Sequence, residues 1–227
     1  MKFKRIIAAL LVAVLTLFAF CSCGSDDACE YASKRKTKGR DISYVEMSVK
    51  DYGKVVILLD KTTAPITVEN FLKLVNEGFY DGLTFHRIIT EFMIQGGDPE
   101  GNGTGGAKDT IVGEFSSNGY NNDISHIRGV ISMARSNDPD SASSQFFICN
   151  ADASESLDGN YAAFGYVVKG MSVIDKITAE VFPKTVFAEY YGTIYHDYWA
   201  YYGNGTVDKD EDKPVIEYIK VLENYKH

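Results

Sequence analysis

The chain has 227 residues, a formal net charge of −8 and 45% hydrophobic residues. This hydrophobic content can build a core, which excludes a chain that is disordered throughout. The acidic balance argues against nucleic-acid binding through phosphate attraction, and four cysteines are too few for a disulfide-built scaffold of this size.

The N-terminal segment has the pattern of a signal peptide. Three basic residues within the first five positions precede an uncharged, apolar run over residues 6–20. A run of this length is typical of a secretory signal and is short for a helix that spans a bilayer. We therefore assign residues 1–22 to a signal peptide and residues 23–40, which lack apolar periodicity, to a polar tether.

Two cysteines at the end of this segment indicate a lipid anchor. Cys23 follows the small residue Ser22 after the apolar run, and this arrangement resembles the lipidation box of bacterial lipoproteins. Cys21 is the alternative lipidation site. The expected location is extracytoplasmic, with the protein anchored by lipid to the bacterial cell membrane. A plain signal peptide with incidental cysteines is the alternative.

From residue 41 onwards the chain has the pattern of short strands separated by glycine-rich turns. Alternating residues or short apolar runs predict strands over 44–49, 54–59, 84–88, 92–96, 130–134, 145–149, 163–168 and 215–222. Many short strands with such turns favour an antiparallel barrel or sandwich. Helices are too few for a parallel α/β sheet.

Two segments show helical periodicity. The apolar residues at positions 68, 71, 72 and 75 share one helix face, with Thr67 as the expected N-cap after Pro65 and Gly78 at the end. A second, shorter helix is expected over 172–178. The apolar face of the first helix indicates packing against a core.

One predicted strand places an arginine in apolar surroundings. Alternation puts Arg87 on the same face as Phe85 and Ile89, and an unpaired charge there would be costly. Gln95 in the next strand is a neutral side chain that can orient a guanidinium by hydrogen bonding. Four apolar residues could form a slot beside it, although composition alone makes them ordinary core residues: Phe92, Met93, Phe147 and Leu157.

No pattern predicts a metal or a cofactor. Residues 101–106 satisfy G-x-G-x-x-G, but no helix is expected after them to bind the phosphates of a dinucleotide. The four histidines lack the spacing typical of metal ligands. We therefore expect chemistry that needs neither.

Several motifs, in a fixed order, resemble the cyclophilin-type peptidyl-prolyl isomerase family. They are FHRII at 85–89, FMIQGGD at 92–98, GNGTGG at 101–106, ISMARS at 131–136, SASSQFFI at 141–148 and LDGNYAAFG at 157–165. The resemblance implies a mainly-β fold, a closed eight-stranded antiparallel β-barrel capped by two helices. Short loops point to the compact bacterial branch of the family. The domain would occupy residues 41–227, with an aromatic-rich insertion at about 183–212.

The resemblance also implies the site residues. Arg87 and Gln95 would be the catalytic pair. The substrate-binding residues would be Phe92, Met93, Ala134, Arg135, Gln145, Phe147, Leu157 and Tyr161. Ser156 stands where many members of the family carry a tryptophan that matters for cyclosporin binding, which predicts weak inhibition by that drug.

The activity implied is the isomerisation of X–Pro bonds in secreted or surface polypeptides. Amide resonance imposes a barrier of about 18–20 kcal/mol on this rotation. Twisting the bond leaves a lone pair on the prolyl nitrogen. Arg87, as a hydrogen-bond donor held in a fixed position, would therefore stabilise the twisted state more than the planar one.

The expected partners are unfolded or secreted polypeptides that contain proline, and the membrane through the lipid anchor. We expect no nucleic acid and a monomeric protein. A module or chaperone that binds proline-containing segments with little turnover is the alternative function. A third alternative is a barrel whose slot is filled by the aromatic insertion.

Overall fold

A computed structural model describes residues 37–186 and 204–225 of the chain. The predicted signal peptide, both candidate lipidation cysteines, most of the tether and residues 187–203 of the aromatic insertion lie outside the described residues. Between residues 37 and 225, the described helices include none that is long and apolar enough to cross a membrane.

Eight antiparallel strands form one sheet in the order β3-β4-β6-β5-β7-β2-β1-β8. The strands are β1 (Ile42–Val49), β2 (Gly53–Asp60), β3 (Thr84–Ile89), β4 (Met93–Asp98), β5 (Val130–Met133), β6 (Phe146–Cys149), β7 (Ala163–Lys169) and β8 (Ile216–Val221). The α-helices described are α3 (Pro65–Asn76), α4 (Ser154–Leu157) and α5 (Met171–Val186). The predicted mainly-β fold with eight antiparallel strands is confirmed.

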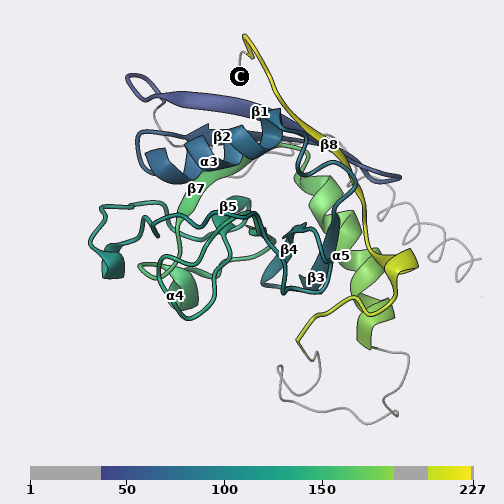
Figure 1. Cartoon of the computed structure of the whole chain (residues 1–227). Helices are drawn as coiled ribbons and strands as arrows, with labels where there is room; N and C mark the ends of the chain where they lie inside the picture. The colour runs from purple at the N-terminus through teal and green to yellow at the C-terminus, as the bar shows by residue number, and fades with distance from the viewer. Residues whose placement is uncertain (1–36, 187–203, 226–227) are drawn as a thin grey trace, which may run out of the picture.

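The sheet curls into a half-barrel whose edge strands approach each other (Figure 1). Thr84 in β3 and Val215, directly before β8, form an isolated antiparallel bridge. Phe85 N donates to Pro214 O over 2.9 Å beside it. Further along β3 the outer edge is taken by residues 205–207, so the two edge strands meet only at their beginnings within the described chain.

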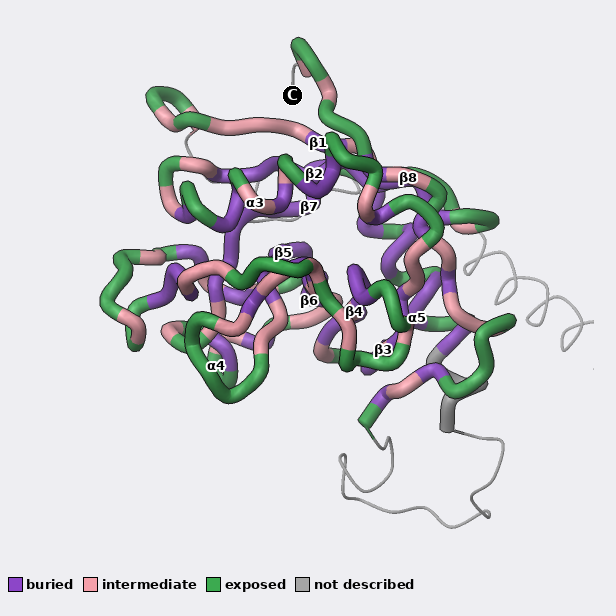
Figure 2. The backbone as a smooth tube through the Cα atoms, in the orientation of Figure 1, coloured by how far each residue is buried: buried purple, intermediate pink, exposed green. Residues whose placement is uncertain are grey.

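Helices α3 and α5 both pack against the sheet. Helix α3 contacts β2 and β8, and α5 contacts β2 and β3. Phe71 of α3 inserts into an aromatic cluster, with its ring centroid 5.0 Å from Tyr80, 5.2 Å from Phe164 and 5.7 Å from Phe146. Figure 2 shows buried residues along the strands and on the inner sides of the helices. The predicted core face of the first helix is therefore confirmed.

Helix α3 begins two residues before its predicted N-cap. Pro65 is the first helical residue, and Thr67, the expected cap, lies inside the helix and is fully buried. The carboxylate of Glu114 accepts hydrogen bonds from Ile66 N over 3.1 Å, from Thr67 N over 2.7 Å and from Thr67 Oγ1 over 2.7 Å. The N-cap prediction was wrong because the capping group comes from a carboxylate 47 positions away.

Helix α5 is longer than the sequence pattern predicts. It extends to Val186 instead of ending near residue 178, so it includes the first residues of the predicted insertion. The last residues of the insertion return along the outer edge of β3. There Ile88 N donates to Gly205 O over 2.8 Å, and Val207 N donates to His86 O over 2.9 Å. The chain thus adds a short extended segment next to the strand that carries Arg87.

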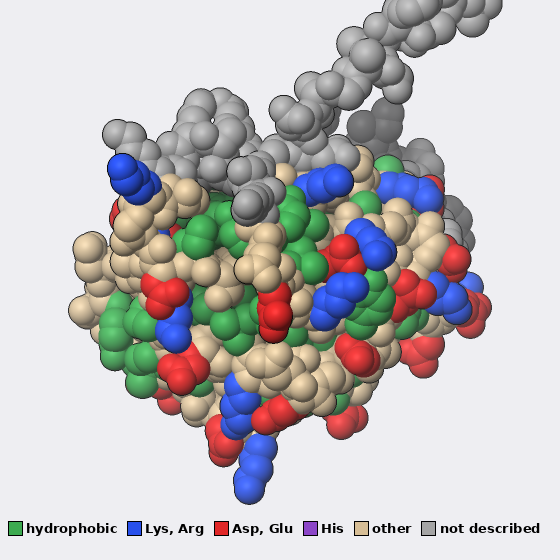
Figure 3. Space-filling view, turned by 90° about the horizontal axis from the view of Figure 1, so that it is seen from above, with side chains coloured by type: hydrophobic (Ala, Val, Ile, Leu, Met, Phe, Trp, Pro, Cys, Tyr) green, Lys and Arg blue, Asp and Glu red, His purple; other side chains and the backbone are tan. Residues whose placement is uncertain are grey.

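The surface seen from above in Figure 3 carries acidic and basic side chains interspersed with hydrophobic ones. Glu46 of β1 pairs with Lys54 of β2 at 3.0 Å and with Lys220 of β8 at 3.2 Å. Both lysines are more than half exposed, and exposed pairs of this kind contribute about 0–1 kcal/mol each. The fold therefore depends mainly on its buried core.

Candidate active site

One pocket, with a volume of about 330 Å³, brings together most of the predicted site residues. Those that line it are Arg87, Phe92, Met93, Gln95, Ala134, Arg135, Phe147, Leu157 and Tyr161. Gln145 lies behind this wall and touches the pocket through its contact with Gln95. The residues come from β3, the turn between β3 and β4, β4, β6, the end of α4 and the chain that follows β5 and α4.

The sheet register places the polar and apolar parts of the pocket side by side. Arg87 pairs with Gln95 across β3 and β4, and Gln95 pairs with Phe147 across β4 and β6. Residues opposite each other in antiparallel strands project to the same face. The three side chains therefore form a row that leads from the arginine to the apolar wall.

The apolar wall belongs to a hydrophobic cluster that is separate from the main core. Met93, Phe147 and Leu157 are buried in it, and Phe92 and Tyr161 pack against it as partly buried residues. The wall is consequently apolar and partly exposed to solvent. Such a surface can receive a small apolar ring such as that of proline.

The guanidinium of Arg87 is held from two sides. Its Nη1 donates to Gln95 Oε1 over 3.3 Å, and its Nε donates to the backbone oxygen of Asn204 over 2.7 Å. Burial lowers the pKa of Arg87, while Tyr161 acts in the opposite direction. An arginine nevertheless stays charged at working pH. The other guanidinium N–H groups have no hydrogen-bond partner within the described chain, and Arg87 lines the pocket.

A chain of amides fixes the orientation of Gln95. Its Nε2 donates to Gln145 Oε1 over 2.8 Å, and Gln145 Nε2 donates to Gly105 O over 2.7 Å and to Gly103 O over 3.1 Å. Because each amide nitrogen has a carbonyl to bond, the Gln95 oxygen is left to face Arg87. The loop at 103–105 therefore contributes to the position of the guanidinium.

Sequence reasoning missed the wall formed by the end of the insertion. Asn204 and Thr206 line the pocket, and Thr206 forms a bridge with Arg87 on the outer side of β3. Gly205 between them has a φ of +77°, and a Cβ there would lie 2.3 Å from Ile89 Cγ1. Only glycine allows this approach. The Asn-Gly pair signals a turn, but nothing in the sequence says which strand the turn contacts.

The side chain of Arg135 folds back over the pocket rim. Its guanidinium carbon lies 4.8 Å from the ring centroid of Tyr161 and 5.1 Å from that of Phe115. Its Nε and Nη2 donate to Asn160 O over 3.0 and 2.9 Å. The side chain of Arg135, a predicted substrate-binding residue, therefore also supports the ring of Tyr161.

His86 also lines the pocket, next to Arg87. It is 2% exposed, and neither ring nitrogen has a hydrogen-bond partner within the described chain. Burial lowers its pKa, and the charge of Asp98 works against this shift. Across residues 37–186 and 204–225, no group of three or more His, Cys, Asp or Glu side chains is arranged to hold a metal ion.

Proteins named as peptidyl-prolyl cis-trans isomerases share much of this sequence. The family profile described as "Cyclophilin type peptidyl-prolyl cis-trans isomerase/CLD" matches residues 44–189. Peptidyl-prolyl cis-trans isomerase A of Dickeya dadantii is 41% identical over 179 residues, which cover 77% of this chain and 84% of that protein. Peptidyl-prolyl cis-trans isomerase B of Escherichia coli is 43% identical over 134 residues, covering 56% of this chain and 79% of the relative.

A solved structure of a cyclophilin-type isomerase has a similar fold. The crystal structure of a Cryptosporidium parvum cyclophilin-type peptidyl-prolyl cis-trans isomerase, determined in the presence of the dipeptide Ala-Pro, superposes with a TM-score of 0.62. It is 25% identical, and the match covers 80% of this chain and 99% of the other. The motifs, the curled sheet, the pocket and these relatives agree: the chain belongs to the cyclophilin-type peptidyl-prolyl cis-trans isomerase family and is an isomerase of X–Pro peptide bonds.

Proposed function

We propose that this isomerase assists the folding of secreted or surface polypeptides, and that Arg87 promotes twisting of the X–Pro amide. The observation that carries the mechanism is the position of Arg87 at the wall of an apolar pocket, fixed by Gln95 and by the Asn204 carbonyl. Phe92, Met93, Phe147 and Leu157 would receive the proline ring, with Ala134, Arg135, Gln145 and Tyr161 bordering the peptide.

The chemistry follows from the electronic structure of the imide bond. In the planar state the prolyl nitrogen shares its lone pair with the carbonyl, and in the twisted state the lone pair is localised and can accept a hydrogen bond. A prepositioned cationic donor is therefore worth more in the twisted state. A hydrogen bond to a charged group contributes about 1.5–3 kcal/mol. Because about 1.4 kcal/mol of transition-state stabilisation raises the rate tenfold, this hydrogen bond accounts for a rate increase of roughly 10- to 150-fold.

The decisive experiment is a protease-coupled isomerisation assay on a proline-containing peptide. Arg87→Ala should lower kcat/KM by at least tenfold, and Arg87→Lys should restore little because an ammonium lacks the planar fork of donors. Arg128→Ala is the matched control, since Arg128 pairs with Asp175 of α5 outside the pocket and its loss should leave kcat/KM unchanged. Equal rates for wild type and Arg87→Ala would favour a proline-segment binding module with little turnover.

The enzyme is proposed to be extracytoplasmic and anchored by lipid to the bacterial cell membrane. This location rests on the sequence: the apolar run over 6–20 followed by Cys23, with Cys21 as the alternative, and the tether over 23–40. Labelling cells with a radioactive fatty acid tests it. Label should appear in the wild type and in Cys21→Ala and disappear in Cys23→Ala. Label lost only in Cys21→Ala would move the anchor to the other cysteine, and an unlabelled wild type would reject lipidation.

The remaining expectations concern partners. Extracytoplasmic clients fold without ATP, so an isomerase without cofactors suits them, because slow prolyl isomerisation limits folding. The proposed clients are unfolded or secreted chains that contain proline, and the enzyme is proposed to work as a monomer of the compact bacterial branch. Sedimentation equilibrium of the domain from residue 41 onwards tests the monomer, and a concentration-dependent mass would contradict it.

A further inference from the structure

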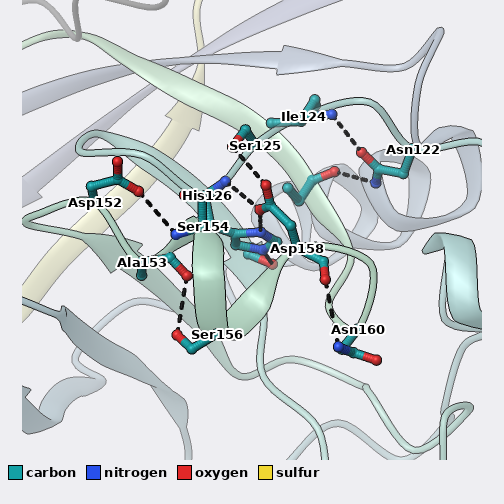
Figure 4. Close-up of polar contacts among 12 residues, drawn as sticks. Asn122, Ile124, Ser125, His126, Asp152, Ala153, Ser154, Ser156, Asp158 and Asn160 are labelled. Atoms are coloured by element: carbon teal, nitrogen blue, oxygen red, sulfur yellow. Dashed lines mark hydrogen bonds and ion pairs between the residues drawn. The ribbon is translucent and has the colours of Figure 1, made fainter.

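A hydroxyl, an imidazole and a carboxylate are aligned behind the pocket wall. His126 Nδ1 lies 2.8 Å from Asp158 Oδ1, and His126 Nε2 lies 2.9 Å from Ser132 Oγ. Figure 4 shows the His126–Asp158 part of this line. The same order of groups activates the nucleophile of serine hydrolases. Ser132, however, is 0% exposed, so no substrate can reach its hydroxyl and the line must serve another purpose.

The hydrogen bonds define the protonation state of the imidazole. A carboxylate only accepts, so His126 Nδ1 carries the hydrogen that is donated to Asp158. The Nε2 lone pair is then free to accept the hydroxyl hydrogen of Ser132. Burial lowers the pKa of His126, and Asp158 offsets this only in part. The ring is therefore neutral at pH 7.

Asp158 is itself held firmly. Its carboxylate also accepts hydrogen bonds from His126 N over 2.7 Å and from Ser125 Oγ over 2.6 Å. Burial raises the pKa of Asp158, but these hydrogen bonds outweigh burial and the pKa is lowered overall. The carboxylate thus remains charged and keeps the imidazole in one orientation.

The imidazole contacts two of the residues that line the pocket. Its ring stacks against Phe147, with centroids 6.0 Å apart and an interplanar angle of 22°, and it meets Tyr161 edge-on at 6.5 Å. Phe147 and Tyr161 pack against each other at 5.9 Å. Asp158, bonded to the ring, directly follows Leu157 in the chain. Movement of His126 would therefore disturb one whole side of the slot.

We propose that His126 is a positioning residue of the isomerase: its neutral imidazole, fixed by Asp158 and Ser132, holds Phe147 and Tyr161 in the places that form the slot. The proposal rests on the function proposed for this pocket as the proline site. It assigns no chemical step to His126, which does not line the pocket.

Protonation of the ring should disturb this support. A proton on Nε2 would turn the acceptor of the Ser132 hydroxyl into a donor, and the hydroxyl hydrogen would need another acceptor inside the core. A buried hydroxyl without a partner costs about 1–3 kcal/mol. Activity should therefore fall as the pH drops through the lowered pKa of His126, below its ordinary value of 6.5.

Other titratable or charged groups lie near enough to matter. Asp158 contacts His126, and Tyr161 meets it edge-on. Asp152 acts electrostatically on Asp158, and Arg135 lies over the Tyr161 ring. Across the pocket, His86 also has a pKa lowered by burial, so its titration has to be separated from that of His126.

The experiment measures catalysed isomerisation of a proline tetrapeptide by NMR exchange spectroscopy, which needs no coupling protease, from pH 8 down through the midpoint of His126 protonation. Wild-type kcat/KM should fall at least threefold, mainly through KM, once the pH lies below that midpoint, and His86→Gln should keep this loss. His126→Phe preserves an aromatic ring but cannot titrate. It should have a raised KM at pH 8 and a flat profile.

Two further measurements make the test specific. Ser132→Ala should flatten the profile while His126 still titrates, because the hydroxyl that loses its acceptor is gone. The ¹⁵N shifts of the His126 ring should report the Nδ1–H tautomer at pH 7 and a midpoint below 6.5. Circular dichroism melts of every variant give the folded fraction, to which kcat/KM is normalised.

The overturning results are distinct from failure of the proposed function. A wild type whose kcat/KM stays constant across the measured midpoint of His126 protonation, a His126→Phe variant with wild-type KM and pH dependence, or an Nε2–H tautomer would each reject His126 as a positioning residue. An Arg87→Ala variant with full activity would instead reject the proposed mechanism, whatever the pH profile.

Discussion

Arg87 and Asn204 are 117 positions apart in the chain, and Arg87 Nε donates to the backbone oxygen of Asn204 over 2.7 Å. Because the acceptor is a backbone atom, no side-chain substitution at Asn204 removes it. The direction of the guanidinium depends instead on how closely residues 205–207 lie against β3. A change that moves this segment away from β3 should therefore also move the guanidinium.

Gly205→Ala should reduce activity by displacing that segment. The new Cβ would lie 2.3 Å from Ile89 Cγ1 and 2.8 Å from Ile88 O, so the chain must move away and withdraw the acceptor of Arg87. We expect kcat/KM to fall roughly tenfold, or about 1.4 kcal/mol, in the peptide isomerisation assay. Gly119→Ala is the control, since its φ of +85° is similar and nothing lies within 4 Å of its Cβ. Equal losses in both variants would contradict the argument.

Gln95→Glu should impair the enzyme although it keeps an oxygen near Arg87. The carboxylate would pair with the guanidinium and weaken it as a donor to the prolyl nitrogen. It could also no longer donate to Gln145 Oε1, which now lies 2.8 Å from Gln95 Nε2. We expect a loss of about tenfold or more in kcat/KM at pH 8. Activity at or above the wild-type level would show that a neutral partner is not required.

Glu114→Ala should destabilise the fold and leave catalysis intact. The change removes the acceptor of two backbone N–H groups and one hydroxyl at the start of α3. Leaving such buried donors unpaired costs about 1–3 kcal/mol, which urea unfolding would measure as a lower midpoint at an unchanged slope. Glu69→Ala, on the exposed side of the same helix, should shift stability by less than about 0.5 kcal/mol. A Glu114→Ala variant as stable as that control would show that the cap is not needed.

Asp98 should make the folding stability decrease at acidic pH. Its buried carboxylate accepts hydrogen bonds from the backbone N–H groups of Glu100, Asn102 and Gly103. Burial raises its pKa, but these bonds outweigh burial and the pKa is lowered overall. As the pH falls below the ordinary value of 3.8, the unfolded chain binds the proton first, so folding stability is lost through the lowered pKa.

The measurement is urea unfolding of wild type and Asp98→Asn from pH 3 to pH 7. The stability difference between them should be largest above pH 4 and should shrink as the pH approaches 3. The direction of this change is the test. A difference that grows in acid would mean that the carboxyl pKa is raised in the folded state.

Ser156 provides the last prediction. It lies in α4 directly before Leu157 of the pocket, and its hydroxyl donates to Ala153 O over 3.1 Å. A serine cannot supply the indole that many members of the family use to bind cyclosporin. Inhibition of the wild type should be weak, and Ser156→Trp should strengthen it in the same assay. Nanomolar inhibition of the wild type would refute the prediction.

Local patterns explain what could be predicted from the sequence. Alternation identified β3 and β4, and it placed Arg87 on the face of Ile89, but its placement of Phe85 on that face was wrong because a bulge between Phe85 and Arg87 turns Phe85 into the main core. Gln95 bonds Arg87 as expected, and the two residues are only eight positions apart. The helical spacing of Val68, Phe71 and Val75 identified the core side of α3. In each case the signal lies within one element or between two elements joined by a short turn.

The contacts that could not be predicted are long-range and have no signature of their own. Glu114 caps a helix 47 positions earlier, and His126 bonds a carboxylate 32 positions later. The backbone oxygen of Asn204 belongs to a peptide group like any other. Which donors meet these acceptors is decided by the path of the chain across the curled sheet, and that path is not encoded in any local period.

The covered edge of β3 has a consequence for the proposed action of the enzyme on unfolded chains. A bare strand edge is a template on which another chain can anneal. From Thr84 to Ile88 the outer side of β3 is already paired, first by the chain leading into β8 and then by Gly205 to Val207. If the pocket binds the proline of an unfolded chain as proposed, that chain would be held by its proline and the neighbouring side chains without pairing as an additional strand of the sheet. Binding without strand pairing would favour quick release of the unfolded chain over its aggregation on the enzyme.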